Sequence, residues 1–385
     1  MKFYSFHLMP WPYLEENFRD NNDSAWVTLS NSNYDPKRGA QLYKRYIDEL
    51  AYADQLGFDG VCVNEHHQNA YGNMPSPNII ATMLVEKVKG KIAVVGNAIP
   101  LREDPVRIAE EIAMLDLLSG GRIISGFVRG LGAEYHSFSK NPTESRERFH
   151  EAHKLIIDAW TKQGPFEHYG KYYKFRYVNP WPIPIQKPHP PVWIPSQGSS
   201  ETVAWTAEKK YTYVQTYSSI DTIRRVFKQF KEEANKCGYE ASPEQMGWAL
   251  PVYVADTDKK AMKEAEHGID YLFNQAFKMP HEIFFPAGYL TLNSIKNVLK
   301  AKKGIGTTKL AFEYLVDKEY VLVGSPETVR QKLAKYQEEF GFGNLLPMMQ
   351  FGTLSHEKTM ENIKLFAEKV IPSLKPLGEQ AVIAN

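Results

Sequence analysis

The chain has 385 residues, and 43% of them are apolar, which excludes a disordered tail or a coiled coil as its main structure. Its 46 Lys and Arg against 45 Asp and Glu give a net charge of +1, too low for a protein that neutralises many phosphates, so we expect no nucleic-acid partner. We expect a cytoplasmic protein that does not enter membranes. No apolar run approaches the about 18 residues that cross a bilayer, and residues 1–7 lack a secretory signal. Cys62 and Cys237 suggest no disulfide framework.

Short apolar strands alternate with amphipathic helices along the chain. Strands are expected at 2–9, 58–63, 91–97, 122–127, 192–195, 211–216, 248–254 and 345–351. Helices are expected at 38–56, 77–88, from 105 to a stop at 119–121, and at 144–162, 199–208, 221–237, 259–277 and 357–370. The third helix has the clearest start, because Asp104 can cap it and Pro105 occupies its first position. A hairpin is expected at 166–177.

Eight strand–helix units predict a parallel sheet closed into a (β/α)₈ TIM barrel. The alternative is an open doubly wound sheet, but no Gly-x-Gly-x-x-Gly segment opens the first helix. We expect one domain over residues 1–385, with insertions at about 11–36, after the first strand, and at about 280–320, before the last strand. Such insertions lie at the catalytic rim of a barrel and can act as lids.

Glu65, His66 and His67 follow the second strand directly, where barrel enzymes place catalytic groups. A metal site is one interpretation, but adjacent residues of a strand point to opposite faces, so two neighbouring histidines do not readily share an ion. There is also no His-Glu-x-x-His segment. The other interpretations are a structural histidine pair and an acid–base or oxygen-positioning role for one imidazole.

Two further strand ends carry residues suited to an anion. Arg129 lies in the glycine-containing segment 126–132, where it is either a charged group at the rim or an exposed residue of a tight turn. The segment 196–202 has small residues and hydroxyls where a helix begins, a position that binds phosphate or carries an ordinary serine cap. Arg146 either adds charge there or belongs to a solvated helix face. Asn97 ends the third strand, where it either bonds a ring amide or satisfies local backbone.

Taken together, these segments resemble the bacterial luciferase-like family of flavin monooxygenases. The resemblance spans nearly the whole chain. It is carried by FDGVCVNEHH at 58–67, DPVRIAE at 104–110, LDLLSGGR at 115–122, GFVRG at 126–130, WTAE at 205–208, GSPETV at 324–329, and 345–352.

The resemblance implies a monooxygenase that acts on a small organic substrate through a C4a-hydroperoxide of reduced FMN and O₂, with the flavin supplied by a separate reductase. Family members also pair their barrels through helices early in the chain, which implies a homodimer. By position, the catalytic residues are His66 near the flavin C4a edge, with Glu65 and His67 orienting it. The cofactor-binding residues are Asn97 by the isoalloxazine ring, Arg129 and Arg146, and Gly198, Ser199 and Thr202 at the phosphate.

This chain also departs from the family pattern. Val128 stands where luciferase has a cysteine beside the corresponding arginine, and the two insertions do not align. Long-chain aldehyde and light emission therefore do not follow from the resemblance. Candidates for an aromatic substrate lining are Trp11, Tyr13, Tyr71 and Tyr217.

Three alternatives remain beside the FMN monooxygenase. The same fold serves oxidoreductases that use the deazaflavin coenzyme F420, and it also serves non-catalytic flavin-binding subunits. A metal-dependent barrel hydrolase is the third, although we expect no metal.

Overall fold

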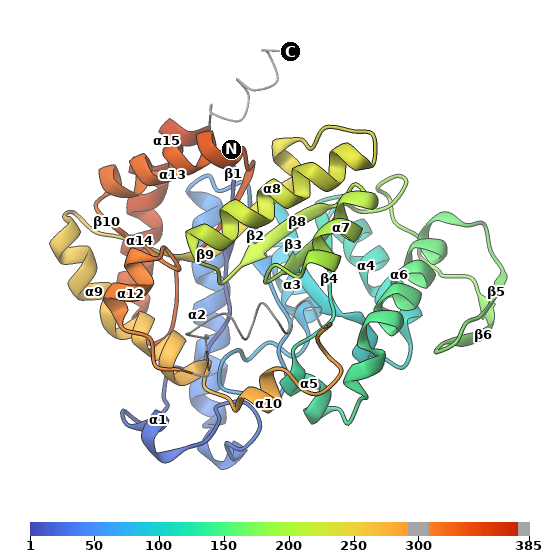
Figure 1. The fold of residues 1–385 in the computed structure, drawn as a ribbon, viewed down its shortest axis with the longest axis horizontal. Helices are drawn as coiled ribbons and strands as arrows, with labels where there is room; N and C mark the ends of the chain where they lie inside the picture. Colours follow the sequence, from blue (N-terminus) through green and yellow to red (C-terminus); the bar gives the residue numbers. More distant parts are fainter. Residues whose placement is uncertain (292–305, 307, 376–385) are drawn as a thin grey trace.

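A closed barrel of eight parallel strands forms the centre of the protein (Figure 1). The computed structural model describes residues 1–291, 306 and 308–375. The barrel strands are β1 (Lys2–Phe6), β2 (Gly60–Val63), β3 (Lys91–Ala98), β4 (Ile123–Val128), β7 (Val192–Ser196), β8 (Thr212–Thr216), β9 (Met246–Val254) and β11 (Asn344–Met348).

The order of pairing closes the barrel. The strands run β9-β11-β1-β2-β3-β4-β7-β8, and β8 pairs with β9 through Tyr213 and Met246. Every pair in the barrel is parallel. The predicted (β/α)₈ barrel is therefore confirmed, and the open sheet is wrong.

Helices surround the barrel and follow its strands (Figure 1). The main ones are α2 (Pro36–Gln55), α3 (Pro77–Val85), α4 (Pro105–Leu118), α6 (Ser145–Thr161), α7 (Ser200–Glu208), α8 (Ile220–Lys236), α9 (Asp258–Asp270), α13 (Pro326–Phe340) and α14 (His356–Lys369). The cap predicted for α4 is present, because the Asp104 side chain accepts a hydrogen bond from the Val106 amide. This bond satisfies an amide that the helix itself leaves unpaired.

Each barrel strand is buried on both faces. In β3, Ala93 and Val95 pack inside the barrel with Tyr4, whereas Ile92 and Val94 pack outward with the helices. Strands covered on both sides have continuous apolar sequences, which explains why they were recognisable.

Several short elements were not predicted. β10 (Leu322–Gly324) is a ninth strand of the main sheet and pairs with β9. The helix predicted at 259–277 consists of α9 and, directly after it, a π-helical stretch over Tyr271–Ala276. The further short helices are α1 (Phe18–Asn21), α5 (Gly132–Ser137), α10 (His281–Phe284), α12 (Phe312–Asp317) and α15 (Ile371–Leu374). The predicted hairpin is formed by β5 (Phe166–Tyr169) and β6 (Lys174–Val178).

The first insertion packs against the π-helical stretch. The Tyr271 hydroxyl donates to the Trp11 carbonyl at 2.6 Å, and the Trp26 indole donates to the Ala276 carbonyl at 2.9 Å. Residues 11–36 therefore lie over the segment that precedes the second insertion. Of that second insertion, residues 292–305 and 307 lie outside the described residues.

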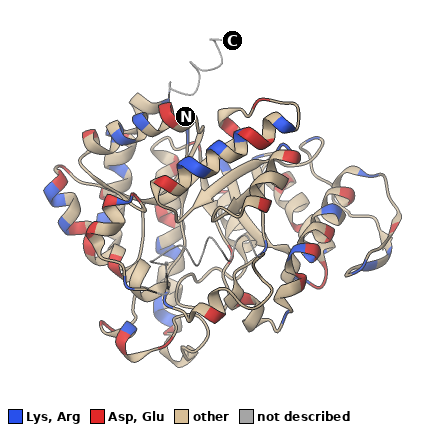
Figure 2. Cartoon of the chain, viewed as in Figure 1, with Lys and Arg blue, Asp and Glu red and all other residues tan. Residues whose placement is uncertain are grey.

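Charged side chains of both signs are mixed over the outer helices (Figure 2). Within the described residues, none of the helices combines the length and apolar character needed to span a bilayer.

We predict that buried His153 makes the fold less stable in acid. Burial lowers the pKa of His153, which lies on α6, to about 3, whereas the unfolded chain titrates near 6.5. Between these values the unfolded state binds the extra proton, so the free energy of unfolding falls as pH falls from 7 to 5, by about 2 kcal/mol from this residue. Urea unfolding at both pH values measures the difference. His153→Gln should remove most of it, and the exposed control His136→Gln should not. Equal pH dependence in wild type and His153→Gln would contradict the prediction.

Candidate active site

The predicted site residues meet at one mouth of the barrel. His66 follows β2, Arg129 follows β4, and Ser199 comes between β7 and α7. Because all barrel strands are parallel, these strand ends share the same rim, which is the catalytic rim of such barrels.

His66 pairs with a buried carboxylate. Its Nδ1 lies 3.0 Å from Glu134 Oε1, and the second oxygen of Glu134 accepts the Leu131 amide at 2.7 Å. The Glu134 side chain is 2% exposed and that of His66 is 16% exposed. Since a carboxylate only accepts, it keeps the proton on Nδ1 and leaves Nε2 free to accept or donate one.

Glu65 and His67 form a separate pair. Glu65 Oε1 lies 2.6 Å from His67 Nε2, and Oε2 accepts a hydrogen bond from Arg102 at 2.7 Å. The side chains of Glu65 and His67 thus point one way and that of His66 the other, as expected for alternating residues. Within the described residues, the partner of the His66 ring is Glu134 rather than either neighbour.

Glu134 was not predicted as a site residue from the sequence. It lies on the short helix α5, 68 positions after His66, and its neighbours form no known catalytic motif. Only the fold brings the two side chains together. The glycine pair at 130 and 132 was the nearest available signal: Gly130 has φ +83° and would place a Cβ 3.1 Å from the Glu134 carboxylate.

Arg129 and Arg146 form a pair of like charges. Burial, and then the charge of Arg129, lower the pKa of the Arg146 guanidinium, and Glu201 acts in the opposite direction. Arg129 donates to Ser145 Oγ at 3.2 Å and to the Tyr289 carbonyl at 3.3 Å. Among the described residues Arg146 has no hydrogen bond or ion pair. Two partly buried guanidinium groups without a matching set of carboxylates favour an added anion.

The start of α7 lies beside this arginine pair. Gly198 has φ +94°, and Ser199 is the residue before the helix. The Ser199 hydroxyl does not cap the helix but donates to Glu201 at 2.9 Å. Thr202 lies in the first turn and is partly exposed. The first amides of the helix thus lack a side-chain cap from Ser199, an arrangement that suits a phosphate.

Glu201 is a carboxylate within this cationic region. Burial alone would raise the pKa of Glu201, but hydrogen bonds from Thr291 and Ser199 and the charge of Arg146 outweigh it and lower the pKa. Thr291 Oγ1 donates to Glu201 at 2.6 Å. Nearby, the Tyr289 ring lies under Arg129, with 4.3 Å between guanidinium carbon and ring centre. The start of the second insertion therefore contacts Arg129 and Glu201.

Asn97 bonds to an outer helix of the barrel. It is fully buried in β3, and its amide nitrogen donates to Asn78 Oδ1 on α3 at 3.3 Å. Its Oδ1 makes no hydrogen bond among the described residues. The structure thus directs the Asn97 amide toward a helix of the outer layer.

The four aromatic residues predicted to line the substrate-binding site fall into two groups. Trp11 and Tyr13 contact each other, and Trp11 also packs on Tyr34, outside the barrel interior. The prediction is therefore wrong for these two, because the chain turns them toward α2. Tyr71 and Tyr217 do lie at the mouth, where the Tyr71 ring centre is 4.9 Å from that of His66.

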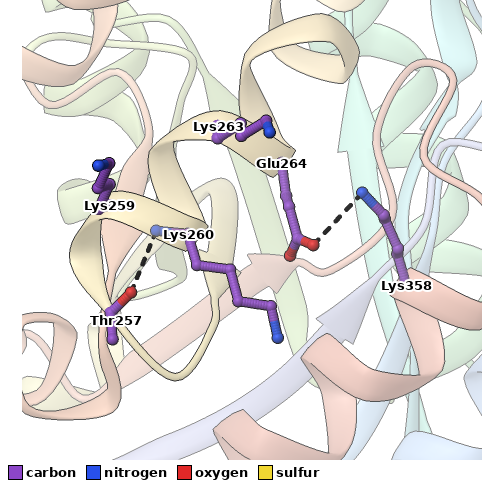
Figure 3. Close-up of a pocket in the computed structure, with 6 residues that line it drawn as sticks. All are labelled: Thr257, Lys259, Lys260, Lys263, Glu264 and Lys358. Carbon is purple, nitrogen blue, oxygen red and sulfur yellow. Dashed lines mark hydrogen bonds and ion pairs between the residues drawn. The ribbon is translucent and has the colours of Figure 1, made fainter.

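A surface hollow between α9 and α14 is a separate feature (Figure 3). Its lining residues are Thr257, Lys259, Lys260, Lys263, Glu264 and Lys358. Lys260 pairs with Asp256 at 2.8 Å and Lys358 with Glu264 at 3.6 Å. Lys259, Lys260 and Lys263 are exposed, and Lys260 and Lys358 are already paired, so we assign no ligand to the hollow.

Comparison with known proteins identifies the family. Residues 24–341 match the family described as luciferase-like monooxygenase, so the chain belongs to that family and the resemblance is confirmed. The chain is 26% identical to the oxygenase component of flavin-dependent trigonelline monooxygenase from Acinetobacter baylyi, over 65% of this chain and 70% of that protein.

Two solved structures share the fold. One is the oxygenating constituent of the Pseudomonas putida 3,6-diketocamphane monooxygenase in complex with FMN, with a TM-score of 0.72 at 20% identity over 97% of this chain and 98% of that one. The other is an F420-dependent secondary alcohol dehydrogenase in complex with an F420–acetone adduct, with a TM-score of 0.64 at 14% identity over 89% and 96%.

The residues present fit a phosphate-bearing flavin. Arg146, which makes no hydrogen bond among the described residues, supplies charge beside Arg129, and the start of α7, which the Ser199 side chain does not cap, supplies amide donors for a phosphate. At the other side of the mouth, the His66–Glu134 pair supplies a proton-handling group. Within the described residues, no cluster of three or more metal-ligating side chains is present.

Proposed function

We propose that this protein is the oxygenase component of a two-component monooxygenase that takes reduced FMN from a separate reductase and acts with O₂ on a small organic substrate. The observation that carries the proposal is the placement of the His66–Glu134 pair and the Arg129–Arg146 pair at one barrel mouth. Membership in the luciferase-like family supports it.

In this proposal each residue has a distinct role. Bound reduced FMN supplies the electrons that activate O₂. Arg129 and Arg146, with the amides at the start of α7, hold the phosphate. His66 holds or moves a proton at Nε2, and Glu134 fixes the tautomer that leaves this nitrogen free. Glu65 and Arg102 keep His67 and the adjoining backbone in place.

The aromatic side chains over the mouth serve to exclude water. Trp26, Tyr71 and Phe277 are each at most 2% exposed and pack on one another. A dry pocket favours oxygen transfer to substrate over loss of the reducing equivalents as H₂O₂.

A deazaflavin coenzyme is the second candidate, because an F420-dependent dehydrogenase shares the fold. Anaerobic titration of the purified chain with reduced FMN and, separately, with reduced F420 distinguishes the two. We expect tight binding of reduced FMN and weak binding of F420. Tight binding of F420 with none of reduced FMN would overturn the proposal.

We also propose that the protein is a homodimer formed through α3 and α4. These neighbouring helices expose large apolar side chains: Ile79, Met83, Met114, Leu117 and Leu118. Ile79 is 65% exposed and Leu118 is 55% exposed. Exposed apolar residues grouped on adjacent helices are typical of an interface.

Light scattering of the purified chain tests the dimer. We expect the mass of two chains for the wild type and of one chain for the double variant Ile79→Asp with Leu118→Asp, because charges at the interface core remain unpaired on association. The control Tyr169→Asp, at an exposed aromatic position of the β5–β6 hairpin, should stay dimeric. A wild-type monomer would contradict the proposal.

A further inference from the structure

Glu201 is an acidic residue in the cationic region that we propose for the flavin phosphate. It is the second residue of α7 and is partly exposed, so a ligand can reach it. Its Oε1 accepts a hydrogen bond from Thr291 Oγ1 at 2.6 Å, and its Oε2 accepts one from the Ser199 hydroxyl at 2.9 Å. The Ser199 side chain thus holds the carboxylate in place of capping the helix.

The Glu201 carboxylate is ionised and keeps room for one more donor. Hydrogen bonds from Thr291, from its own backbone amide and from Ser199, and then the charge of Arg146, lower its pKa against the effect of burial. A carboxylate has about four acceptor positions. The described residues fill three of them, and the fourth is open to a donor from a ligand.

This carboxylate repels a fully ionised phosphate but attracts one that carries a proton. The second pKa of a phosphate monoester is about 6, so near neutral pH the group readily carries one P–OH. Such a hydroxyl donates to a carboxylate in a short, charge-assisted hydrogen bond. A phosphodiester and a sulfate ester hold no proton at neutral pH, so either one leaves Glu201 facing an anionic oxygen.

The other charged and titratable groups near Glu201 do not make this distinction. On α8, a guanidinium nitrogen of Arg225 lies 3.3 Å from the position that a Cβ would take at Gly198. On α6, His150 follows Arg146 by one helical turn, and its ring lies 5.1 Å from a tryptophan ring of α7. Burial, and then the charge of Arg146, lower the pKa of His150. Cationic groups and ring N–H groups donate to any anion, whereas a carboxylate accepts only from an ester that has a proton.

We propose that Glu201 accepts a hydrogen bond from the P–OH group of a flavin phosphate monoester and so selects this ester over phosphodiesters and sulfate esters. The proton stays on the phosphate oxygen, and the remaining phosphate oxygens accept from the arginines and the α7 amides. This inference rests on the proposed function, because it concerns the phosphate of the proposed flavin. Glu201 is thus a specificity-determining residue that acts on the cofactor tail.

Two flavin esters of equal charge test this selection in the wild-type chain. At about pH 5.5 FMN phosphate and riboflavin 5′-sulfate are both mostly singly charged, but only the phosphate carries a proton. Anaerobic titration of the full chain with each reduced ester gives the two dissociation constants. We expect reduced FMN to bind about 10- to 100-fold more tightly, the usual contribution of one hydrogen bond to a charged group. Equal binding, or tighter binding of the sulfate, would overturn the inference.

Glu201→Gln tests whether this residue carries the preference. The amide keeps the shape and can donate to either ester, so the two dissociation constants should come within about 3-fold of each other. Reduced riboflavin, which has no ester, should bind this variant as it binds the wild type. Glu208→Gln, at an exposed acid of the same helix, is the matched control and should keep the wild-type preference. A preference that persists in Glu201→Gln would contradict the inference.

The pH dependence of the preference gives a second readout. As pH rises from 5.5 to 8, free FMN loses the proton that Glu201 requires, so the wild-type preference for FMN over the sulfate should shrink. For a site made of arginines alone it would grow, because the doubly charged phosphate attracts them more strongly. If reduced FMN binds without this preference, the inference fails while the proposed function stands. If the chain binds no reduced FMN, both fail.

Discussion

His66→Ala is expected to lower oxygen transfer to substrate by a factor of about 100 to 10,000, the usual contribution of a positioned acid or base. The reason is that the His66 ring borders Trp26 and Tyr71 at the mouth, and its pairing with buried Glu134 through Nδ1 leaves Nε2 free for a proton. With a separate reductase, NADH and a substrate that the wild type oxygenates present, NADH oxidation should continue while the H₂O₂ formed per NADH rises toward one. Product formation and H₂O₂ are measured in the same assay.

Two variants serve as comparisons for His66→Ala. Glu134→Gln keeps the shape but can donate to Nδ1 and so favour the wrong tautomer, and we expect an intermediate loss with a shifted pH profile. His136→Ala removes an exposed histidine of the same helix as Glu134 and should leave turnover unchanged. Product formation by His66→Ala within 2-fold of wild type would show that this imidazole is not catalytic.

Arg146→Ala is expected to weaken FMN binding by roughly 10- to 100-fold, the equivalent of one or two charge-assisted hydrogen bonds. Riboflavin lacks the phosphate, so its affinity should not change. Because Arg146 lies beside Arg129 without a hydrogen bond of its own among the described residues, its removal should leave the melting temperature of the free protein unchanged or raise it. Titrations with reduced FMN and reduced riboflavin under anaerobic conditions measure both affinities.

The control for Arg146→Ala is Lys154→Ala, which removes an exposed cation of the same helix that pairs with Asp158. It should change neither affinity. Equal weakening of FMN and riboflavin by Arg146→Ala, together with a lower melting temperature, would mean that the arginine supports the fold rather than the phosphate.

Local sequence determined much of the fold. The Asp104–Pro105 start of α4 and the apolar runs of the barrel strands depend on neighbours in the chain, so they could be predicted. The parallel arrangement of the strands then follows, because each intervening helix carries the chain back to the same end of the sheet, so that successive strands run in the same direction. The π-helical stretch and β10 depend on packing against the first insertion and β9, contacts that no local pattern reports.

The candidate site was predictable to a smaller extent. The placement of His66 and Arg129 at strand ends followed from the barrel, and their common rim followed from the parallel strands. The Glu134 carboxylate could not be predicted, since its contact with His66 spans 68 positions. Likewise, the cover of Arg129 by Tyr289 joins residues 160 positions apart.

A crystal structure of the protein soaked with FMN tests most directly whether one flavin connects these residues. We predict that the phosphate lies within hydrogen-bond distance of Arg129, Arg146 and the Ser199–Thr202 turn, with the ring system reaching His66. A flavin bound at another surface, or bound at the mouth with its phosphate away from both arginines, would contradict the account.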